Sequence, residues 1–194
     1  MAEVTGVVLA AGAGRRYGQP KALVTYDGRL LVERAVATLT DGGCAEVLVI
    51  LGAAADEVQA RADLDGTATI VNPDWDTGMG SSLRTALSAV ASTGADAVVI
   101  LLVDTPGVTP AAVRRVAAHA GPAALAIATY RGQPGHPVLL GREHWAGAAE
   151  VAIGDVGARR YLAAHDAQVT HVPCDDIADG EDLDRPPNPV SNPA

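Results

Sequence analysis

The sequence predicts an α/β fold of three layers, in which a doubly wound and mostly parallel sheet lies between two layers of helices. Short apolar runs rich in β-forming residues alternate with longer amphipathic segments along the 194 residues, and this alternation is typical of parallel strands joined by crossover helices. Several runs, such as 97–103, are apolar without interruption, as expected for strands buried on both faces. The length suits one domain, which we place at residues 1–185, followed by a flexible Pro-rich tail over residues 186–194.

The expected elements follow one another with short connections. We expect strands at residues 5–10, 45–51, 67–71, 97–103, 123–130, 136–140 and 168–173. We expect helices at about residues 29–41, 55–63, 81–93, 109–120, 143–150 and 157–165. The strands ending near residues 10, 71 and 103 run into segments rich in glycine or acidic residues. Ligands bind at the carboxyl ends of strands in such sheets, so these segments are expected to form one site.

Composition excludes several classes of function. The net charge of -9 leaves no global positive field for nucleic acid. No apolar run approaches the roughly 20 residues of a membrane helix, and the N-terminus does not resemble a signal peptide. The two cysteines, Cys44 and Cys174, form no CxxC pattern, which favours a reduced, cytoplasmic protein without disulfides.

The stretch "AGAGRRYGQPK" at residues 11–21 directly follows the first expected strand. Its glycines, among them Gly12 and Gly14, can adopt positive φ and let a ligand approach the backbone, whose N–H groups bind phosphate oxygens. Arg16 and Lys21 would neutralise a polyphosphate. The other interpretation is a flexible turn with solvated charges.

Two common phosphate motifs do not fit this loop. Tyr17 occupies the position where a dinucleotide GxGxxG motif needs its third glycine. Ala22 follows Lys21, where a P-loop needs Ser or Thr. Lys21 is the only lysine in the chain, and Pro20 fixes the backbone just before it. Lysine carries a compact point charge, which suits contact with a reacting phosphate.

Asp104 follows the apolar run 97–103 and precedes a turn. A carboxylate at the end of a central strand, beside a phosphate loop, is suited to hold Mg²⁺, although an Asp that only hydrogen-bonds its own turn remains the alternative. Thr109 is expected to cap the next helix, with Pro110 at its first position.

The segment "TGMGSSL" supplies two glycines and two serines before an amphipathic helix. Ser81 and Ser82 are candidates for the N-cap, and together with Gly78 and Gly80 they could bind the base or ribose of a nucleotide. An ordinary capped helix after a turn is the alternative.

The stretch "LAAGAGRRYGQPK" resembles the signature LAAGxxxRxGxPK of the MobA-like nucleotidyltransferases, and the resemblance extends over about residues 5–185. Among these proteins the chain is most similar to the molybdenum cofactor cytidylyltransferases. The resemblance implies a Rossmann-like nucleotide-diphospho-sugar transferase fold and Mg²⁺-dependent transfer of CMP from CTP to molybdopterin or molybdenum cofactor, with release of pyrophosphate; Mn²⁺ is an alternative metal. Members with "LAAG" tend to use CTP and those with "LAGG" tend to use GTP, so Ala11 favours CTP.

The resemblance also implies roles for individual residues. Arg16, Lys21 and Asp104 would be catalytic, with Asp104 as a metal ligand. The nucleotide would contact Leu9, Ala10, Ala11, Gly12, Ala13, Gly14, Lys21, Gly78, Gly80, Ser81 and Ser82.

The C-terminal part of the motif departs from the family. The family often carries "DTPED", whose first Asp assists the metal, and aligning "EDL" puts Ala178 at that position. Asp176 or Asp179 would have to substitute as the second metal ligand. The alternative is an acidic, solvated segment.

The segments "GHPVLL" and "GDVGARRYL" resemble the acceptor side of the cytidylyltransferases. His136, Asp155 and Arg159 would then bind the acceptor, although His136 could be a structural turn histidine. A molybdoenzyme or its maturation factor would be the partner. Two other functions stay open: a nucleotidyltransferase for another phosphorylated acceptor such as a sugar phosphate, and a non-catalytic accessory protein that binds nucleotide or pterin.

Overall fold

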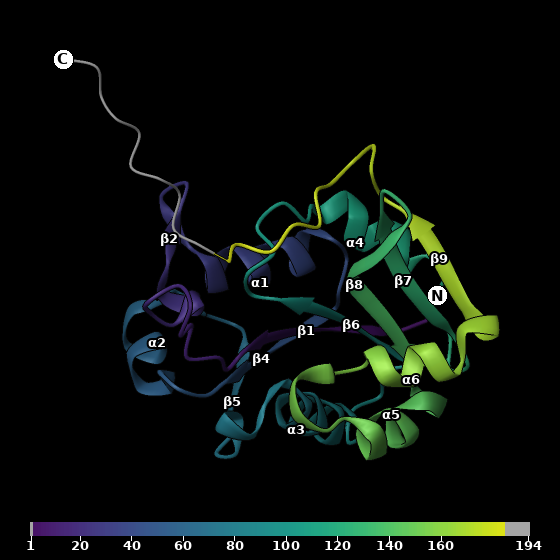
Figure 1. Ribbon diagram of the computed structural model, residues 1–194, viewed down its shortest axis with the longest axis horizontal. Coiled ribbons are helices and arrows are strands. Elements are labelled where there is room, and N and C mark those ends of the chain that lie inside the picture. The colour runs from purple at the N-terminus through teal and green to yellow at the C-terminus, as the bar shows by residue number, and fades with distance from the viewer. Residues whose placement is uncertain (1, 185–194) are drawn as a thin grey trace.

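The computed structural model describes residues 2–184, which form a three-layer α/β sandwich (Figure 1); the tail expected at residues 186–194 lies outside them. The strands are β1 (Val4–Ala10), β2 (Thr25–Tyr26), β3 (Arg29–Leu30), β4 (Glu46–Leu51), β5 (Ala68–Val71), β6 (Ala97–Leu102), β7 (Leu125–Tyr130), β8 (Gln133–Gly141) and β9 (Val169–Pro173). The α-helices are α1 (Leu31–Asp41), α2 (Ala55–Arg61), α3 (Met79–Val90), α4 (Pro110–Ala117), α5 (Trp145–Val151) and α6 (Arg159–Ala164). These elements confirm the predicted fold class.

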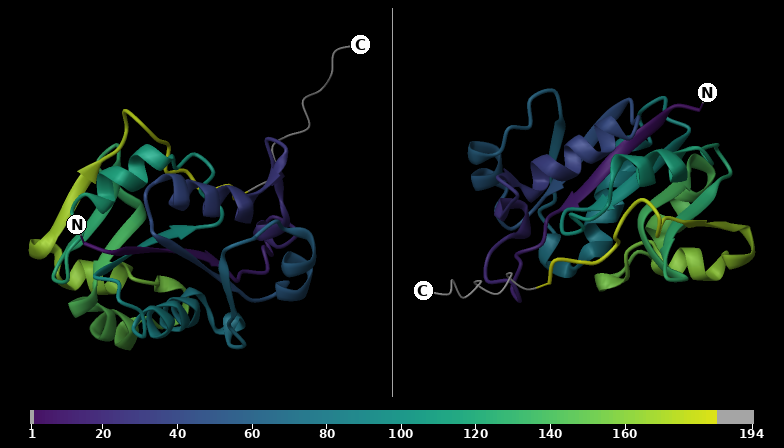
Figure 2. Two further views of the ribbon diagram at one scale, coloured as in Figure 1. Left: turned by 180° about the vertical axis from the view of Figure 1, so that it is seen from behind. Right: turned by 90° about the horizontal axis from the view of Figure 1, so that it is seen from above.

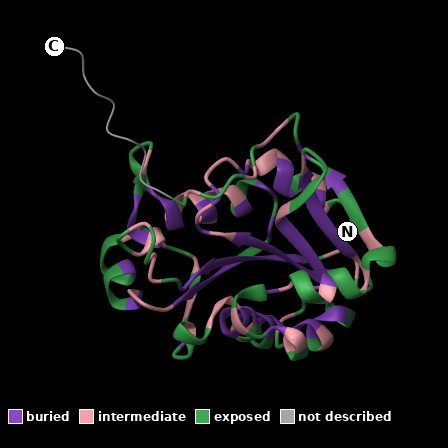
Figure 3. Cartoon of the chain, viewed as in Figure 1, coloured by how far each residue is buried: buried purple, intermediate pink, exposed green. Residues whose placement is uncertain are grey.

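The main sheet has seven strands in the order β5-β4-β1-β6-β8-β7-β9 among the described residues. All neighbours pair in parallel except β8, which is antiparallel to both β6 and β7. Val7 of β1 lies opposite Leu48 of β4 and Ile100 of β6. Every residue of β1 is buried, as its apolar sequence requires, and Figure 3 shows the buried centre of the sheet.

Helices cover the two faces of the sheet and create two apolar cores (Figure 2). Side chains of α1, α2 and α4 pack with one set of strand residues. Side chains of α3, α5 and α6 pack with the other. The residues at i, i+4 and i+8 of α1, Leu31, Ala35 and Leu39, are buried, so its amphipathic pattern produces the expected packing.

One local expectation was wrong. Residues 29 and 30 were expected to begin a helix, but they pair with residues 25 and 26 in the two-stranded β2–β3 hairpin, and α1 begins at Leu31. The turn residues Asp27 and Gly28 have positive φ angles of 48° and 81°, the conformation that Asp-Gly hairpin turns adopt. The Asp-Gly pair was the signal that sequence reasoning missed.

Two other expectations are confirmed within the described residues. Thr109 caps α4, because its side chain accepts a hydrogen bond from the backbone N–H of Ala112, and Pro110 occupies the first turn. Cys44 and Cys174 are both free and buried. Burial raises the pKa of the Cys44 thiol to about 12.

No helix in residues 2–184 has the length and hydropathy needed to cross a membrane.

Candidate active site

A cleft of about 690 Å³ opens at the carboxyl ends of β1 and β6. The three segments that sequence reasoning expected to converge all contribute to it: the loop after β1, the segment around the start of α3, and the turn after β6. Its lining residues are Leu9, residues 11–16, Lys21, Trp75, Asp76, Gly78, Met79, Ser82, residues 102–104, Asp155, Arg159, Asp182 and Asp184.

The charged centre of the cleft is an ion-pair cluster around Lys21. Its ammonium lies 2.5 Å from Oδ2 of Asp104 and 3.3 Å from Oδ1 of Asp184. Partial burial opposes the charge on the ammonium, but the hydrogen bonds and charges of Asp104 and Asp184 outweigh this effect and raise the pKa of Lys21. The geometry therefore joins a point cation and a carboxylate that lie 83 residues apart in sequence.

The loop after β1 is shaped by two of its glycines. Gly14 and Gly18 have positive φ angles, and a Cβ on Gly14 would lie 1.8 Å from the carbonyl oxygen of Gln19, so this glycine closes the loop. Gly12 was expected to use the same conformation but does not. A Cβ on Gly12 would meet nothing within 4 Å. The fold would therefore tolerate a side chain at this position.

The predicted nucleotide residues of this loop divide into two groups. Leu9, Ala11, Gly12, Ala13 and Gly14 line the cleft. Ala10 does not, because it packs in the apolar core beneath α1.

Arg15 and Arg16 are exposed on the rim of the cleft, and neither has an ion-pair partner among residues 2–184. Two guanidinium groups are thus available to a negatively charged ligand.

The expectation that Ser81 or Ser82 caps α3 was wrong. The N-cap is Gly78, with φ 110°, and it makes no side-chain cap. The amide of Asn72 instead donates to Oγ of Ser81 and of Ser82, at 2.8 and 3.0 Å. Because both hydroxyls are buried with Asn72, they hold the segment between β5 and α3 in place.

Gly80 is also structural, because a Cβ there would lie 2.5 Å from the carbonyl oxygen of Ala152. Of the four predicted residues in this segment, Gly78 and Ser82 line the cleft, whereas Gly80 and Ser81 do not.

The structure does not place the two expected second metal ligands, Asp176 and Asp179, in the cleft. Asp176 forms a bidentate pair with Arg115, at 2.6 and 3.0 Å, and does not line the cleft. The backbone N–H of Asp179 donates to the carbonyl oxygen of Gly107, and its carboxylate accepts from the backbone of Glu181. Neither Asp176 nor Asp179 lines the cleft.

In the C-terminal acidic segment, the residues that line the cleft are Asp182 and Asp184, which sequence reasoning missed. The backbone N–H of Leu183 donates to the carbonyl oxygen of Asp104 at 2.8 Å, so the chain lies against the turn after β6 and places an Asp on each side of Leu183. Burial, Asp104 and Asp184 together raise the pKa of Asp182. The chain turns at Leu183, where the backbone N–H of Asp184 donates to the carbonyl oxygen of Asp182 at 2.9 Å, and this turn had no clear signal in the sequence.

This set of side chains suits an oxygen-binding divalent cation. Carboxylates of Asp104, Asp182 and Asp184 are the ligand type that Mg²⁺ prefers. Within residues 2–184 no group of three or more acidic, His or Cys side chains is already gathered around one point. Mg²⁺ is commonly bound by one or two carboxylates plus substrate phosphates, so the residues fit a metal that arrives with a nucleotide.

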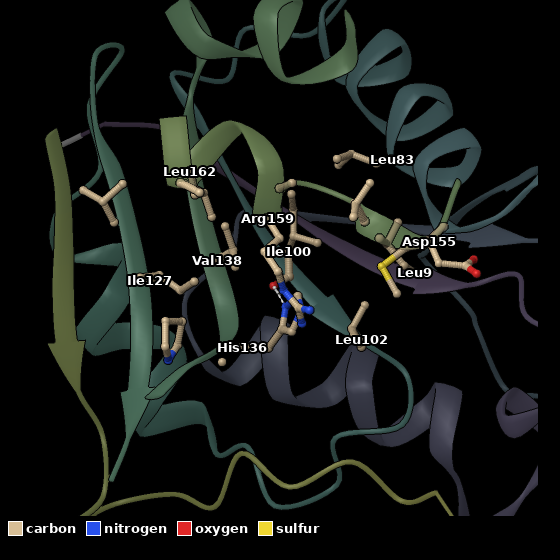
Figure 4. Close-up of a pocket in the computed structure, with 18 of the residues that line it drawn as sticks. Leu9, Leu83, Ile100, Leu102, Ile127, His136, Val138, Asp155, Arg159 and Leu162 are labelled. Carbon is tan, nitrogen blue, oxygen red and sulfur yellow. Dashed lines mark hydrogen bonds between the residues drawn. The ribbon is translucent and has the colours of Figure 1, made fainter. Parts of the chain in front are cut away.

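A second cavity of about 240 Å³ adjoins the cleft, between the sheet and α6 (Figure 4). Asp155 and Arg159, two of the predicted acceptor residues, line both spaces, whereas the third, His136, lines only the second. Nδ1 of His136 lies 3.3 Å from the carbonyl oxygen of Ile100. Burial is the main cause that lowers the pKa of His136, and the charge of Arg159 adds to it.

Comparison of the chain with known proteins identifies its family. Residues 6–169 match the family described as "MobA-like NTP transferase domain". The chain belongs to this family.

The chain is 41% identical over 189 residues to a protein named nicotine blue oxidoreductase from Paenarthrobacter nicotinovorans, covering 93% of this chain and 92% of that one. It is 30% identical to a molybdenum cofactor guanylyltransferase from Rhodobacter capsulatus, over 75% of this chain and 67% of that one.

Among solved structures, Rv0371c from Mycobacterium tuberculosis H37Rv superposes with a TM-score of 0.84 at 32% identity, over 95% of this chain and 93% of that one. A structure titled as its complex with manganese gives a TM-score of 0.75 at 31% identity, over 88% of each chain. The family and the guanylyltransferase relative make the chain a nucleotidyltransferase with the Rossmann-like fold of NTP transferases.

Proposed function

We propose that the chain transfers CMP from CTP to a phosphorylated, molybdopterin-type acceptor in a reaction that depends on Mg²⁺ or Mn²⁺ and releases pyrophosphate. The observation that carries the proposal is the contact between Lys21 and Asp104 in a cleft walled by the glycine-rich loop. A phosphate oxygen of the acceptor attacks the α-phosphorus of CTP, a new P–O bond forms, and the bond to the pyrophosphate group breaks with its electron pair leaving on pyrophosphate.

The side chains supply positioning and positive charge. In the proposed complex Lys21 leaves Asp104 and contacts the triphosphate, whose negative charge exceeds that of one carboxylate. Arg15 and Arg16 on the rim bind the outer phosphates. Asp104, with Asp182 or Asp184, would hold the metal ion, which when bound offsets the charge that develops on the phosphates.

The choice of base rests on Ala11. A Cβ on Gly52 would lie 2.5 Å from the carbonyl oxygen of Ala11 and 2.6 Å from Cβ of Trp75, so Gly52 packs closely against these two residues, which line the cleft. The Cβ of Ala11 is itself buried and faces Gly52, so the choice of CTP rests on the resemblance of "LAAG" to the cytidylyltransferases. The guanylyltransferase among the relatives makes GTP the competing substrate.

Pyrophosphate release tests the proposal. The purified chain is incubated with Mg²⁺ or Mn²⁺ and molybdopterin, and CTP, GTP, ATP and UTP are compared. We expect release with CTP that stops when the metal is chelated. Turnover with GTP alone would keep the reaction and overturn the choice of base, and turnover with a sugar phosphate in place of molybdopterin would overturn the acceptor.

A second candidate follows from the 41% identity to nicotine blue oxidoreductase. On that reading the chain would catalyse a redox reaction of nicotine blue, and a dinucleotide is one redox partner to test. Tyr17 in place of the third glycine of a dinucleotide motif weighs against it. Loss of the dye's colour with NADH or NADPH, without any CTP-dependent pyrophosphate release, would favour this candidate over nucleotidyl transfer.

A further inference from the structure

Trp75 is the only aromatic residue that lines the cleft within residues 2–184. Aromatic side chains are scarce in this chain, which has two tryptophans, four tyrosines and no phenylalanine. The other tryptophan, Trp145, is buried in an apolar core, and its indole N–H donates to the carbonyl oxygen of Leu140. Trp75 is instead partly exposed, in a short helical turn that follows β5. A large apolar ring therefore borders the space that a ligand would occupy.

Contacts on both sides hold the turn that carries Trp75. The side-chain oxygen of Asn72 accepts from the backbone N–H of Asp74 at 3.0 Å, and Oγ of Ser81 lies 2.8 Å from the carbonyl oxygen of Asp74. Gly52 lets Trp75 approach β4, because a Cβ on Gly52 would lie 2.6 Å from Cβ of Trp75. Trp75 is therefore in place before a ligand binds, which lowers the entropic cost of a contact with it.

The order of the strands separates Trp75 from the phosphate-binding groups. Lys21 follows β1, and Asp104 follows β6. Trp75 follows β5, and β4 lies between β5 and β1 (Figure 1), so β5 is about two strand spacings, or roughly 10 Å, from β1. His136 of the expected acceptor side is on β8, beyond β6. The phosphate-binding groups therefore lie between Trp75 and the acceptor side, and a nucleoside triphosphate is long enough to extend from them toward Trp75.

The side chains at the Trp75 end of the cleft do not suit a phosphate. Asp76 follows Trp75 and also lines the cleft, and its negative charge would repel phosphate oxygens. The cations that line the cleft in the described part of the chain come from the segment after β1 and from α6: Arg15, Arg16, Lys21 and Arg159. An uncharged, flat group suits the ring of Trp75 better, and the nucleobase is the part of a nucleotide with these properties.

We infer that the indole ring of Trp75 stacks on the nucleobase of the bound nucleotide. The inference deepens the proposed function and rests on it for the ligand being a nucleotide. Stacking on an aromatic side chain does not require a particular base, because every base has a π-face. Trp75 would therefore supply affinity for the nucleoside, and the choice between CTP and GTP would lie with other groups.

The fluorescence of Trp75 in the full chain tests this inference. Because Trp75 and Trp145 are the only tryptophans, Trp145→Phe leaves the Trp75 signal alone, and Trp75→Phe gives the background from Trp145. We expect CTP with Mg²⁺ to quench the Trp75 signal and to leave the Trp145 signal unchanged. Inorganic tripolyphosphate, which has the phosphates but no base, should bind without this quenching. CTP that binds in calorimetric titration without changing the Trp75 signal would contradict the inference.

The affinity for CTP gives a second measurement that does not use fluorescence. Trp75→Leu should weaken CTP binding by about tenfold, as the loss of one stack between a base and an aromatic ring allows, whereas Trp75→Phe should retain part of the affinity. Neither variant should change the affinity for tripolyphosphate. Tyr26→Leu is the matched control, because it removes a partly exposed ring that does not line the cleft, and it should bind CTP normally. Circular dichroism checks that each variant is folded.

The outcomes distinguish this inference from the proposed function. Equal CTP affinity in folded Trp75→Leu and the unmodified chain would overturn the inference and leave nucleotidyl transfer intact, as would equal losses of affinity for CTP and tripolyphosphate. Binding of CTP that depends on Trp75, in a chain that releases no pyrophosphate with any acceptor, would support the stacking and contradict the transfer. Titrations with GTP, ATP and UTP complete the test, since stacking tolerates any base, and failure of all four nucleotides to bind would overturn both proposals.

Discussion

Lys21 and Asp104 neutralise each other across the cleft, with the ammonium 2.5 Å from the carboxylate oxygen Oδ2. Lys21 begins a short helical turn after the glycine-rich loop, and Asp104 follows the central strand β6. In the proposed reaction these groups have separate partners, a phosphate and a metal ion. The pair therefore holds both side chains in position until a metal nucleotide replaces the contact.

Replacing Lys21 should impair catalysis more than folding. We expect Lys21→Ala to lower kcat/KM on the order of 100-fold, the typical effect of removing one preorganised electrostatic contact. Lys21→Arg keeps the charge as a planar fork and should recover only part of the rate. Steady-state pyrophosphate release measures both variants, and equal rates in Lys21→Ala and the unmodified chain would contradict the role given to this residue.

The three acidic positions should respond differently to amide substitution. Asp104→Asn should abolish metal-dependent turnover, and Asp184→Asn should reduce it, because both carboxylates line the cleft. Asp176→Asn is the matched control, since its carboxylate pairs with Arg115 outside the cleft, and it should leave turnover unchanged. Titration of activity with Mn²⁺ measures each effect. A loss in Asp176→Asn equal to that in Asp184→Asn would restore the metal ligand expected from sequence.

Substitutions at two glycines near the site should affect CTP binding and the free energy of unfolding separately. Gly12→Val should change the free energy of unfolding by no more than about 0.5 kcal/mol, since a Cβ there meets nothing within 4 Å. It should weaken CTP binding by about tenfold, or about 1.4 kcal/mol, because the side chain enters the cleft.

Gly80→Ala should do the reverse. Its Cβ would meet the backbone of Ala152 at 2.5 Å, and we expect a loss of about 1–3 kcal/mol in the free energy of unfolding. Denaturant unfolding and calorimetric titration with CTP measure the two quantities. A Gly12→Val protein that binds CTP normally would show that this backbone does not lie against the ligand.

His136 should make folding stability depend on pH. Its folded-state pKa is lowered, mainly by burial, so below the ordinary value of about 6.5 the unfolded chain binds the proton more readily. Stability should therefore fall as the pH drops from about 7.5 through 6.5 and below. In His136→Leu this part of the decline should disappear. Thermal unfolding at several pH values measures it, and parallel profiles for the two proteins would contradict a neutral, buried imidazole.

The charge on Asp182 should lower the folding stability of the metal-free protein near neutral pH. Burial and two neighbouring carboxylates raise its pKa, so the folded state disfavours its charge above that pKa. We expect Asp182→Asn to raise the melting temperature of the metal-free protein at pH 7, and the gain should shrink as the pH falls through the raised pKa. An unchanged or lower melting temperature at pH 7 would contradict the crowding of carboxylates at this edge of the cleft.

The fold was predictable from the sequence because its periodicity is strong. The buried strands β1, β4 and β6 are continuous apolar runs, and the crossover helices are amphipathic. The segments that line the cleft follow these strands, so the general rule for ligands in open α/β sheets located the site.

The individual side chains were less predictable, because several are fixed by contacts distant in sequence. Ser81 and Ser82 fit the pattern of a helix cap, but Asn72 draws both hydroxyls into a buried cluster. Asp176 and Asp182 are similar in local sequence. Only the tertiary contact of Leu183 with Asp104 decides which acidic residues reach the cleft.

The position of a bound metal tests the central claim most directly. Crystals of the full chain grown with CTP and Mn²⁺ would reveal the ion by its anomalous scattering. The account predicts an anomalous peak within coordination distance of the Asp104 carboxylate and of the nucleotide phosphates, with Lys21 moved from Asp104 to a phosphate. A peak at Asp176 or Asp179, or CTP bound while Lys21 and Asp104 remain paired without metal, would contradict it.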